Sequence, residues 1–395
     1  RVSANVIKTG GAVMQNHLFG DRLVTTFGRR KDINFNRNAA QTTLLPDGIS
    51  PNFDADDVWL NNWFRRSGRT KTTGAVLRPF RGWSFLDGRA QTGSGFTRLA
   101  SDFVRSLNFH YNQADSFIPQ TIAQNLNLRQ LPNPTSETRD RGVSFGLAGK
   151  LYVKLNVYET KQVNSRTGDA GVIATRTGRI DFAFAGNNDQ FNLQRQAAAW
   201  VGSANPTFTQ EQLNAEVARI MEVPVDRLAQ MNAFPIAETS DVVSKGKEIE
   251  ITYNPTNFWT AKATITQQSV VEANVTPGIQ DYIDNRLPIW SKVIDPRTNT
   301  PWFTTRYGSA GTASDFLNGV VLGPYKLLRA TEGKRRPQQR EWRANFLTNY
   351  RLAGLGTDRA WIKRFAVSGA VRWEEKGGIG YYTYDNDPNA YDPNR

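Results

Sequence analysis

In the stretch from Arg141 to Val163, apolar and polar side chains alternate regularly between Val143 and Tyr158, with an interruption only around Gly149, and this pattern permits few folds. Because successive strand side chains point to opposite faces of a sheet, a period of two predicts a strand with one apolar and one polar face. Gly149 can take the positive φ of a tight turn, which predicts an antiparallel hairpin. Its apolar positions, which must contact either a protein core or lipid, are Val143, Phe145, Leu147, Leu151, Val153, Leu155 and Val157.

The spacing of further hairpins indicates how they are connected. A second hairpin is predicted over Glu248–Thr266, and a last one joins 342–352 to 365–373. Short turns alternate with connections of several tens of residues; the turns lie near Gly20, Gly149, Pro255 and Gly356. This rhythm is typical of outer-membrane barrels, whose tilted strands need about 9–11 residues each. The sequence therefore predicts an all-β fold, an incomplete antiparallel transmembrane β-barrel of about ten long strands, with short periplasmic turns and long helix-containing extracellular loops.

Composition excludes several other classes of protein. The mean hydropathy is −0.53, and no run approaches the roughly 18 apolar residues of a membrane-spanning helix, so an α-helical membrane protein is excluded. A barrel remains compatible because its lumen and loops are polar. Cysteine is absent and histidine occurs twice, so we expect no disulfide, no metal centre and no cofactor. The net charge is +13, but Lys and Arg are scattered, so no nucleic-acid partner is expected.

The long connections contain helix signals. Thr209 and Gln212 match a Thr-x-x-Gln capping box, apolar residues follow at helical spacing up to Met221, and Pro224 ends the run. The same spacing predicts helical pieces in the connection that follows the second hairpin, at 279–287 and 316–328.

Three other segments are not predicted to be helical. Asp102–Tyr111 and Arg179–Ala185 are predicted as strands, and 36–68 as an irregular region. This irregular region contains the acidic patch Asp54, Asp56 and Asp57, whose carboxylates suit a hard cation. The patch lacks the glycine and terminal glutamate of an EF-hand loop, so a solvated acidic loop is the favoured interpretation.

Polar residues on the two clearest hairpins are expected to face a wet lumen. They are Lys154, Asn156, Glu248, Glu250 and Lys262. Glu248 and Glu250 share one strand face roughly 7 Å apart, a spacing that glycoside hydrolysis also uses. We favour an ion pair with Lys262 across the hairpin and expect no catalytic residues, because neither a nucleophile elbow nor a phosphate-binding loop occurs.

Aromatic and basic side chains in the predicted loops are the candidates for ligand binding, because loops commonly carry function. The candidates are Trp59, Trp63, Arg65, Arg66, Trp200, Trp290 and Trp302. The arginines beside Trp63 suit an anionic ligand. The alternative is that the rings pack the loops onto one another.

Several segments, in order, resemble the β-barrel of TonB-dependent outer-membrane receptors. They are LFGDRLVTTFGRRKD (Leu18–Asp32), SLNFHYNQADSFIP (Ser106–Pro119), LPNPTSETRDRGVSFGLAGKLYVKLNVYET (Leu131–Thr160), KGKEIEITYNPTNFWTAKATIT (Lys245–Thr266), and NYRLAGLG (Asn349–Gly356) with FAVSGAVRWEEKGGIGY (Phe365–Tyr381). In such receptors a strand with a Gly-x-Glu-x-Glu pattern turns at Asn-Pro-Thr and returns through an aromatic-rich strand.

The resemblance implies a receptor and transporter, not an enzyme, in the outer membrane of a Gram-negative bacterium. It would take up a scarce nutrient, such as a ferric siderophore, a cobalamin-like ligand or a glycan. Its partners would be outer-membrane lipid, the small nutrient ligand and a TonB-type energy-coupling protein that acts through a plug domain. No plug, coupling box or closing strand is recognised, so residues 1–395 are expected to be a partial barrel domain, an internal fragment of a longer protein.

The alternative is a soluble all-β protein that binds or cleaves carbohydrate. That fold would pair its apolar faces in a dry core between two sheets. The side chains of Val153, Leu155, Ile251 and Ile265 distinguish the two hypotheses, because a sandwich buries them and a barrel leaves them facing outward.

Overall fold

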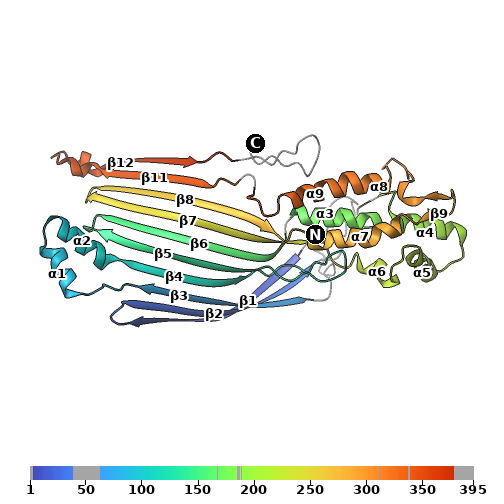
Figure 1. Cartoon of the computed structure of the whole chain (residues 1–395), viewed down its shortest axis with the longest axis horizontal. Helices are drawn as coiled ribbons and strands as arrows, with labels where there is room; N and C mark the ends of the chain where they lie inside the picture. The colour runs from blue at the N-terminus through green and yellow to red at the C-terminus, as the bar shows by residue number, and fades with distance from the viewer. Residues whose placement is uncertain are drawn as a thin grey trace.

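The computed structural model describes residues 3–38, 63–166, 168–184, 187, 189–309, 311–336 and 339–377. A long, single-layered antiparallel sheet occupies one half of the molecule, and most of the helices form a module beyond one end of its strands (Figure 1). None of the helices in these ranges is both long and apolar enough to cross a bilayer.

The sheet has ten strands, and each pairs with its neighbours in the order β1-β2-β3-β4-β5-β6-β7-β8-β11-β12. Its strands are β1 (Ser3–Leu18), β2 (Leu23–Asn38), β3 (Phe64–Leu77), β4 (Asn108–Phe117), β5 (Thr135–Leu147), β6 (Leu151–Arg166), β7 (Thr239–Thr256), β8 (Trp259–Ala273), β11 (Trp342–Arg351) and β12 (Ala366–Glu374). β1 and β12 are the two edges, and within the described ranges no pairing joins them. The predicted antiparallel arrangement of about ten long strands is confirmed, as an open sheet in the described residues, while the helices make the fold mostly β instead of all-β.

The helices lie in the connections between strands. They are α1 (Ser84–Thr92), α2 (Gly95–Ser106), α3 (Gly168–Asp181), α4 (Leu193–Ala204), α5 (Gln210–Ile220), α6 (Val225–Gln230), α7 (Pro277–Trp290), α8 (Ala313–Phe316) and α9 (Gly323–Ala330), with a small hairpin of β9 (Ile294–Asp295) and β10 (Thr300–Pro301). The predicted capping box is confirmed: the Gln212 backbone N–H donates to Thr209 Oγ1 at 3.3 Å, and the Thr209 N–H donates to Gln212 Oε1 at 2.9 Å.

The helices α3 to α9 share one hydrophobic core, which we call the helical module. Its buried side chains come from connections that are far apart in sequence, for example Leu126, Ile173, Met221, Ile279 and Val321. The connections β4–β5, β6–β7 and β8–β11 therefore fold together at one end of the sheet, which we call the loop end (Figure 1). The opposite end carries the tight turns β1–β2, β5–β6 and β7–β8 and is called the turn end.

Two strand predictions are wrong. Residues 95–106 form α2, so the strand expected over Asp102–Tyr111 begins only at Asn108, and the β3–β4 connection places two helices at the turn end. Arg179–Ala185 does not form a strand, because α3 runs to Asp181 and buries Ile180 in the helical module. The irregular region expected over 36–68 is narrower, because β2 reaches Asn38 and β3 starts at Phe64.

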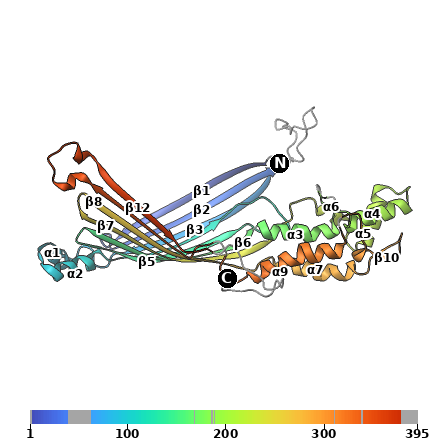
Figure 2. The ribbon, with the colours of Figure 1, turned by 90° about the horizontal axis from the view of Figure 1, so that it is seen from above.

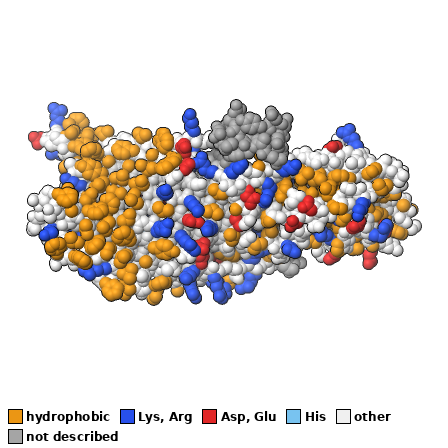
Figure 3. Space-filling model, in the orientation of Figure 1, with side chains coloured by type: hydrophobic (Ala, Val, Ile, Leu, Met, Phe, Trp, Pro, Cys, Tyr) orange, Lys and Arg blue, Asp and Glu red, His pale blue; other side chains and the backbone are white. Residues whose placement is uncertain are grey.

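The register places the apolar side chains of successive strands on one face of the sheet. Val143, Leu155, Ile249, Ile265 and Ala344 lie opposite one another in a single row across β5, β6, β7, β8 and β11. The sheet is curved like a trough, and this apolar face is the convex one (Figures 2 and 3). The polar face lines the inside of the trough.

No second sheet covers the apolar face in the described ranges. Leu155 is 38% exposed and Ile265 is 37% exposed, while Val153 and Ile251 are half-buried by their neighbours in the sheet. A local cover comes from α2, where the Phe103 ring contacts the Phe145 ring at a centroid distance of 4.8 Å. The four side chains that distinguish the two hypotheses are thus not enclosed between stacked sheets.

Candidate functional site

The concave face of the sheet carries the polar side chains predicted to face a lumen. Lys154 lies directly opposite Glu250, and Asn156 lies opposite Glu248, on adjacent strands β6 and β7. Lys262 on β8 lies opposite Thr252 on β7. Directly opposed residues in an antiparallel pair share a face. The structure therefore brings all five predicted residues to one hydrophilic surface, the face opposite the apolar rows.

The pairing expected between Lys262 and the two glutamates is wrong in detail. On β8, Glu248 lies opposite Thr266 and Glu250 lies opposite Thr264. No ion pair involves either glutamate within the described ranges, and both are exposed. These two exposed carboxylates form part of a wet charged surface.

A histidine on this face bridges three strands. His110 Nε2 lies 2.9 Å from Asn156 Oδ1, although β5 separates β4 from β6. The residue between them is Gly142, and a Cβ there would lie 2.6 Å from the His110 ring. Position 142 requires glycine, because any side chain there would block the imidazole of His110 from reaching over β5 to Asn156. His110 therefore orders the concave surface.

Basic residues gather where the concave face meets the loop end. The guanidinium of Arg66 donates to the Leu131 carbonyl at 3.2 Å. Arg166, at the end of β6, donates to the Thr121 carbonyl at 2.5 Å and to the Leu131 carbonyl at 3.5 Å. Two cations thus hold the 118–134 connection against the sheet.

Trp63 directly precedes β3 and is 43% exposed. The Arg37 guanidinium stands over its ring at 4.8 Å from the centroid. Arg65 is also exposed, but alternation along β3 turns it to the convex side, away from Arg66. By the same alternation Trp63 lies on the side of Arg65, so the structure does not bring Trp63 and Arg66 onto one face, and Trp59 lies outside the described residues.

The other three candidate tryptophans are core side chains of the helical module. Trp290 and Trp302 are fully buried, and Trp200 is 3% exposed. The Trp302 indole N–H donates to the Phe191 carbonyl at 2.9 Å, and the Trp290 ring stacks on Phe303. Because these rings present no surface to solvent, the expectation that they contact ligand is corrected to a packing role.

A buried carboxylate organises the same core. Asp181 at the end of α3 is fully buried and accepts hydrogen bonds from three side chains of α7: Tyr282 at 2.7 Å, Arg286 at 2.8 and 2.6 Å, and Trp290 at 2.8 Å. Burial, together with the Asp181 charge, raises the pKa of Tyr282 well above its usual value. This cluster joins the β6–β7 connection to the β8–β11 connection.

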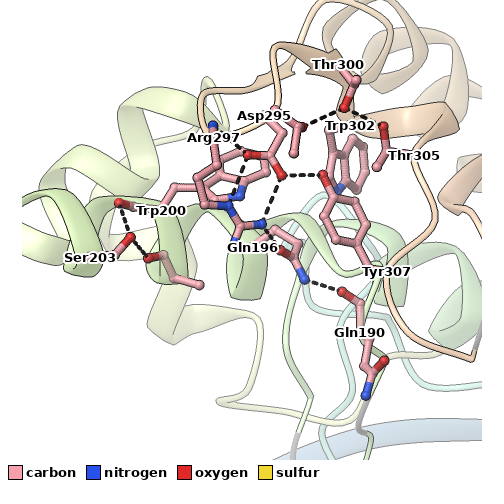
Figure 4. Close-up of polar contacts among 12 residues, drawn as sticks. Gln190, Gln196, Trp200, Ser203, Asp295, Arg297, Thr300, Trp302, Thr305 and Tyr307 are labelled. Carbon is pink, nitrogen blue, oxygen red and sulfur yellow. Dashed lines mark hydrogen bonds and ion pairs between the residues drawn. The ribbon is translucent and has the colours of Figure 1, made fainter.

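A second polar cluster, drawn in Figure 4, lies around β9 and β10 at the tip of the helical module away from the sheet (Figure 1). Asp295 accepts hydrogen bonds from the Arg297 side chain at 3.1 and 2.9 Å and from the Tyr307 hydroxyl at 3.0 Å. The hydrogen bond from Arg297 lowers the pKa of Asp295 to about 2. Arg297 also donates to Gln196 Oε1 of α4 at 3.3 Å, and Gln196 donates to the Gln190 carbonyl at 2.5 Å. All these groups partner one another, so the cluster fixes the tip.

Sequence reasoning missed the two clusters for different reasons. Asp181 and Arg286 are 105 residues apart, so no local spacing signals their contact. Asp295 and Arg297 are two residues apart and were detectable as a local ion pair. Within the described ranges no group of His, Cys, Asp or Glu is arranged to hold a metal ion. The acidic patch Asp54, Asp56 and Asp57 lies outside the described residues.

Comparisons with known proteins add the following findings. No family model matches the sequence, and no curated protein matches it. Among solved structures, the alcaligin outer-membrane receptor of Bordetella pertussis is similar with a TM-score of 0.41 and 12% identity, over 95% of this chain and 38% of that one. The siderophore receptor PiuA of Acinetobacter baumannii gives a TM-score of 0.43 and 10% identity, over 98% and 35% of the two chains. The ferric-catecholate import receptor Fiu of E. coli K12 gives 0.42 and 12%, over 96% and 36%. The chain thus spans less than two thirds of the length of these structures.

Proposed function

We propose that residues 1–395 are part of the barrel wall of an outer-membrane receptor that takes up a small, scarce nutrient in an energy-coupled, TonB-dependent manner. One observation carries the proposal. The sheet has an uncovered apolar face on its convex side and a hydrophilic face inside the trough. The wall of a membrane barrel contacts lipid with its outer face and water with its inner face, and the two faces of this sheet match those two environments.

The exposed apolar area argues for lipid as the outer contact. On the last hairpin Phe346 is 46% exposed, Val367 61%, Val371 64% and Trp373 54%. Each buried Å² of apolar surface stabilises by about 25 cal/mol, so leaving such a band in water is unfavourable. Continuous exposed patches of this kind mark membrane or protein contacts. A sandwich would need a second sheet here, and the described residues do not supply one.

The strand lengths agree with this proposal. β6 has 16 residues and β7 has 18, more than the roughly 9–11 that a tilted strand needs to cross a bilayer. The apolar rows occupy the half of each strand at the turn end, and charged outward side chains begin in the other half (Figure 3). The turn end is therefore assigned to the membrane and the periplasmic side, and the loop end to the outside.

In this proposal the loop end captures the ligand and the concave face conducts it. Trp63 and Arg66 offer an aromatic surface and a cation at the rim, which suit an anionic ligand such as an iron chelate. Lys154, Asn156, Glu248, Glu250 and Lys262 line the hydrophilic path. A TonB-type partner would act through a plug that these residues do not include. The ligand stays within three classes: a ferric siderophore, a cobalamin-like molecule or a glycan.

Single-cysteine labelling tests the membrane placement, because the chain contains no cysteine of its own. In a Gram-negative host that expresses the full-length protein, a water-soluble maleimide is expected to modify Asn156→Cys and Lys154→Cys. It should spare Val153→Cys and Leu155→Cys. Glu159→Cys is the matched control, since it shares the convex face with Leu155 but lies beyond the apolar rows, and it should react.

Equal labelling of Leu155→Cys and Asn156→Cys would contradict the proposal. Recovery of the protein in the soluble fraction, with Val153→Cys and Leu155→Cys protected, would instead favour the soluble carbohydrate protein. The uptake role is tested by ferric-chelate transport into cells. Arg66→Gln should reduce uptake and Arg219→Gln, an exposed arginine of α5, should not. Uptake that persists after the inner-membrane proton gradient is collapsed would refute energy coupling.

A further inference from the structure

The convex face changes abruptly from apolar to cationic toward the loop end. The row Phe109, Val143, Leu155, Ile249 and Ile265 is wholly apolar. The next row toward the loop end, two residues further along each strand, holds Tyr111, Arg141, Val157, Lys247 and Gln267.

The row beyond that one adds Arg139 and Lys245 on the same face. The change in side-chain type thus takes place within one step of the pleat, about 7 Å along a strand. Figure 3 shows Lys and Arg side chains gathered in a belt at this border.

The four cations line a groove of about 580 Å³ across β4 to β8. Arg139 donates to Glu137 at 2.6 Å, and Lys245 lies 3.7 Å from Glu159. Arg141 and Lys247 have no carboxylate within ion-pair distance among the described residues. All four side chains are exposed. The groove therefore offers an excess of positive charge to whatever lies against the convex face.

A second groove continues this belt along the sheet. It measures about 500 Å³ and is lined by Arg29, Lys31, Arg69 and Lys71 of β2 and β3. The register places these four residues opposite one another on the convex face. Their carboxylate neighbour on that face is Asp115. The cationic belt thus follows the curvature of the sheet and lies beside the apolar rows on several strands.

We propose that the groove formed by Arg139, Arg141, Lys245 and Lys247 binds the phosphate groups of anionic membrane lipids. This inference rests on the proposed membrane placement, which puts lipid headgroups at the border between the apolar rows and the belt. Arg and Lys can lay their aliphatic stems on apolar surface and direct the charge toward phosphate. Tyr111 and Trp342, 42% and 40% exposed, lie in the same row as Arg141 and Lys247, the level at which interfacial aromatic residues sit.

A lipid surface explains this arrangement better than a soluble anion. A soluble anion needs convergent cations and no adjoining apolar area. Here the cations form a belt that borders a broad apolar face. A phospholipid has a phosphate group that can contact the cations and acyl chains that can contact the adjoining apolar face. Each cation near an anionic lipid surface strengthens binding several-fold, so two unpaired cations give roughly a 30-fold effect.

The test measures lipid binding to the purified full-length protein in detergent by native mass spectrometry. The probes are phosphatidylglycerol, which is anionic, and phosphatidylcholine, which has no net charge, with equal acyl chains. Arg141→Gln combined with Lys247→Gln should lower the phosphatidylglycerol affinity roughly 30-fold and leave phosphatidylcholine binding unchanged. Retained phosphatidylcholine binding also shows that the variant is folded.

Lys154→Gln combined with Lys262→Gln is the matched control, because it removes the same charge from the concave face. It should leave the preference for phosphatidylglycerol intact. Equal losses in the two double variants, or no loss in the first, would overturn the inference. Displacement of phosphatidylglycerol by an equal concentration of inorganic phosphate would assign the groove to a free anion and would overturn it too. A wild-type protein that binds neither lipid refutes the membrane placement itself, whereas equal binding of both lipids refutes only the phosphate groove.

Discussion

Asp181→Asn is predicted to open the helical module while leaving the sheet intact. Asp181 Oδ1 accepts from Arg286 Nη2 at 2.6 Å and from Trp290 Nε1 at 2.8 Å. Oδ2 accepts from Tyr282 Oη at 2.7 Å and from Arg286 Nε at 2.8 Å. An asparagine replaces one of these oxygens with an NH₂ group. In either orientation of the amide, this NH₂ group faces two hydrogen-bond donors that no longer have an acceptor. It also leaves the Arg286 charge, which is 6% exposed, without its counter-ion.

The magnitude follows from burial. Removing one partner of a buried ion pair costs about 3–5 kcal/mol, because the remaining charge stays desolvated. Each 1.36 kcal/mol is a factor of ten, so the open population of the module should rise roughly 150- to 5,000-fold. Hydrogen exchange of the full-length protein, followed by mass spectrometry, measures this rise in the amides of α3 and α7.

A matched control distinguishes this effect from a general loss of acidic charge. Glu216 pairs with Arg219 at 2.5 Å on the exposed side of α5, in the same module. Exposed pairs contribute little, so Glu216→Gln should leave the exchange of α3 and α7 unchanged. The reasoning is refuted if Asp181→Asn leaves α3 and α7 protected, or if β5, β6 and β7 lose protection to the same degree.

Three further predictions concern stability and ligand capture. Burial raises the pKa of Glu238 to about 7. Because the folded pKa exceeds the unfolded one, the contribution of Glu238 to stability should be fully present below about pH 4.5 and be lost as the pH rises through about 7. Glu238→Gln should flatten this dependence in a pH series of hydrogen exchange. A Cβ at Gly246 would lie 2.4 Å from the Tyr158 ring, so Gly246→Ala should lower the thermal midpoint of the full-length protein. The double variant with Tyr158→Ala should recover part of that loss, and a purely additive result would contradict the contact. Trp302→Ala should destabilise the helical module by about 3–5 kcal/mol, whereas Trp63→Ala should reduce ferric-chelate uptake and leave that stability unchanged. If Trp302→Ala instead reduced ferric-chelate uptake and left the stability of the module unchanged, Trp302 would be assigned to the ligand site.

The hairpins were predictable because their information is local. Alternation along 141–163 placed Val153 and Leu155 on one face and Lys154 on the other, and the register confirms the two faces. The capping box at Thr209 is local in the same way and is confirmed.

The failures occur where long-range packing decides the structure. Ile180, Phe182 and Phe184 alternate with polar or small residues as a strand would, yet Ile180 and Phe182 are buried in the helical module by residues about a hundred positions away. Short alternation is compatible with the end of a helix as well as with a strand. The buried tryptophans were misplaced for the same reason. Nothing local in the sequence shows that three separate connections share one core.

Spin-label accessibility along β6 shows whether the apolar convex face contacts lipid. Nitroxides are attached to single cysteines at 151–163 in the full-length protein reconstituted in bilayers. Collisions with oxygen report lipid, and collisions with a water-soluble nickel chelate report water. From Leu151 to Val157 the account predicts oxygen-rich odd positions and nickel-rich even positions. From Glu159 onward, both faces should be accessible to nickel. Low accessibility to both reagents at Val153 and Leu155 would show a protein core on the convex face and contradict the account.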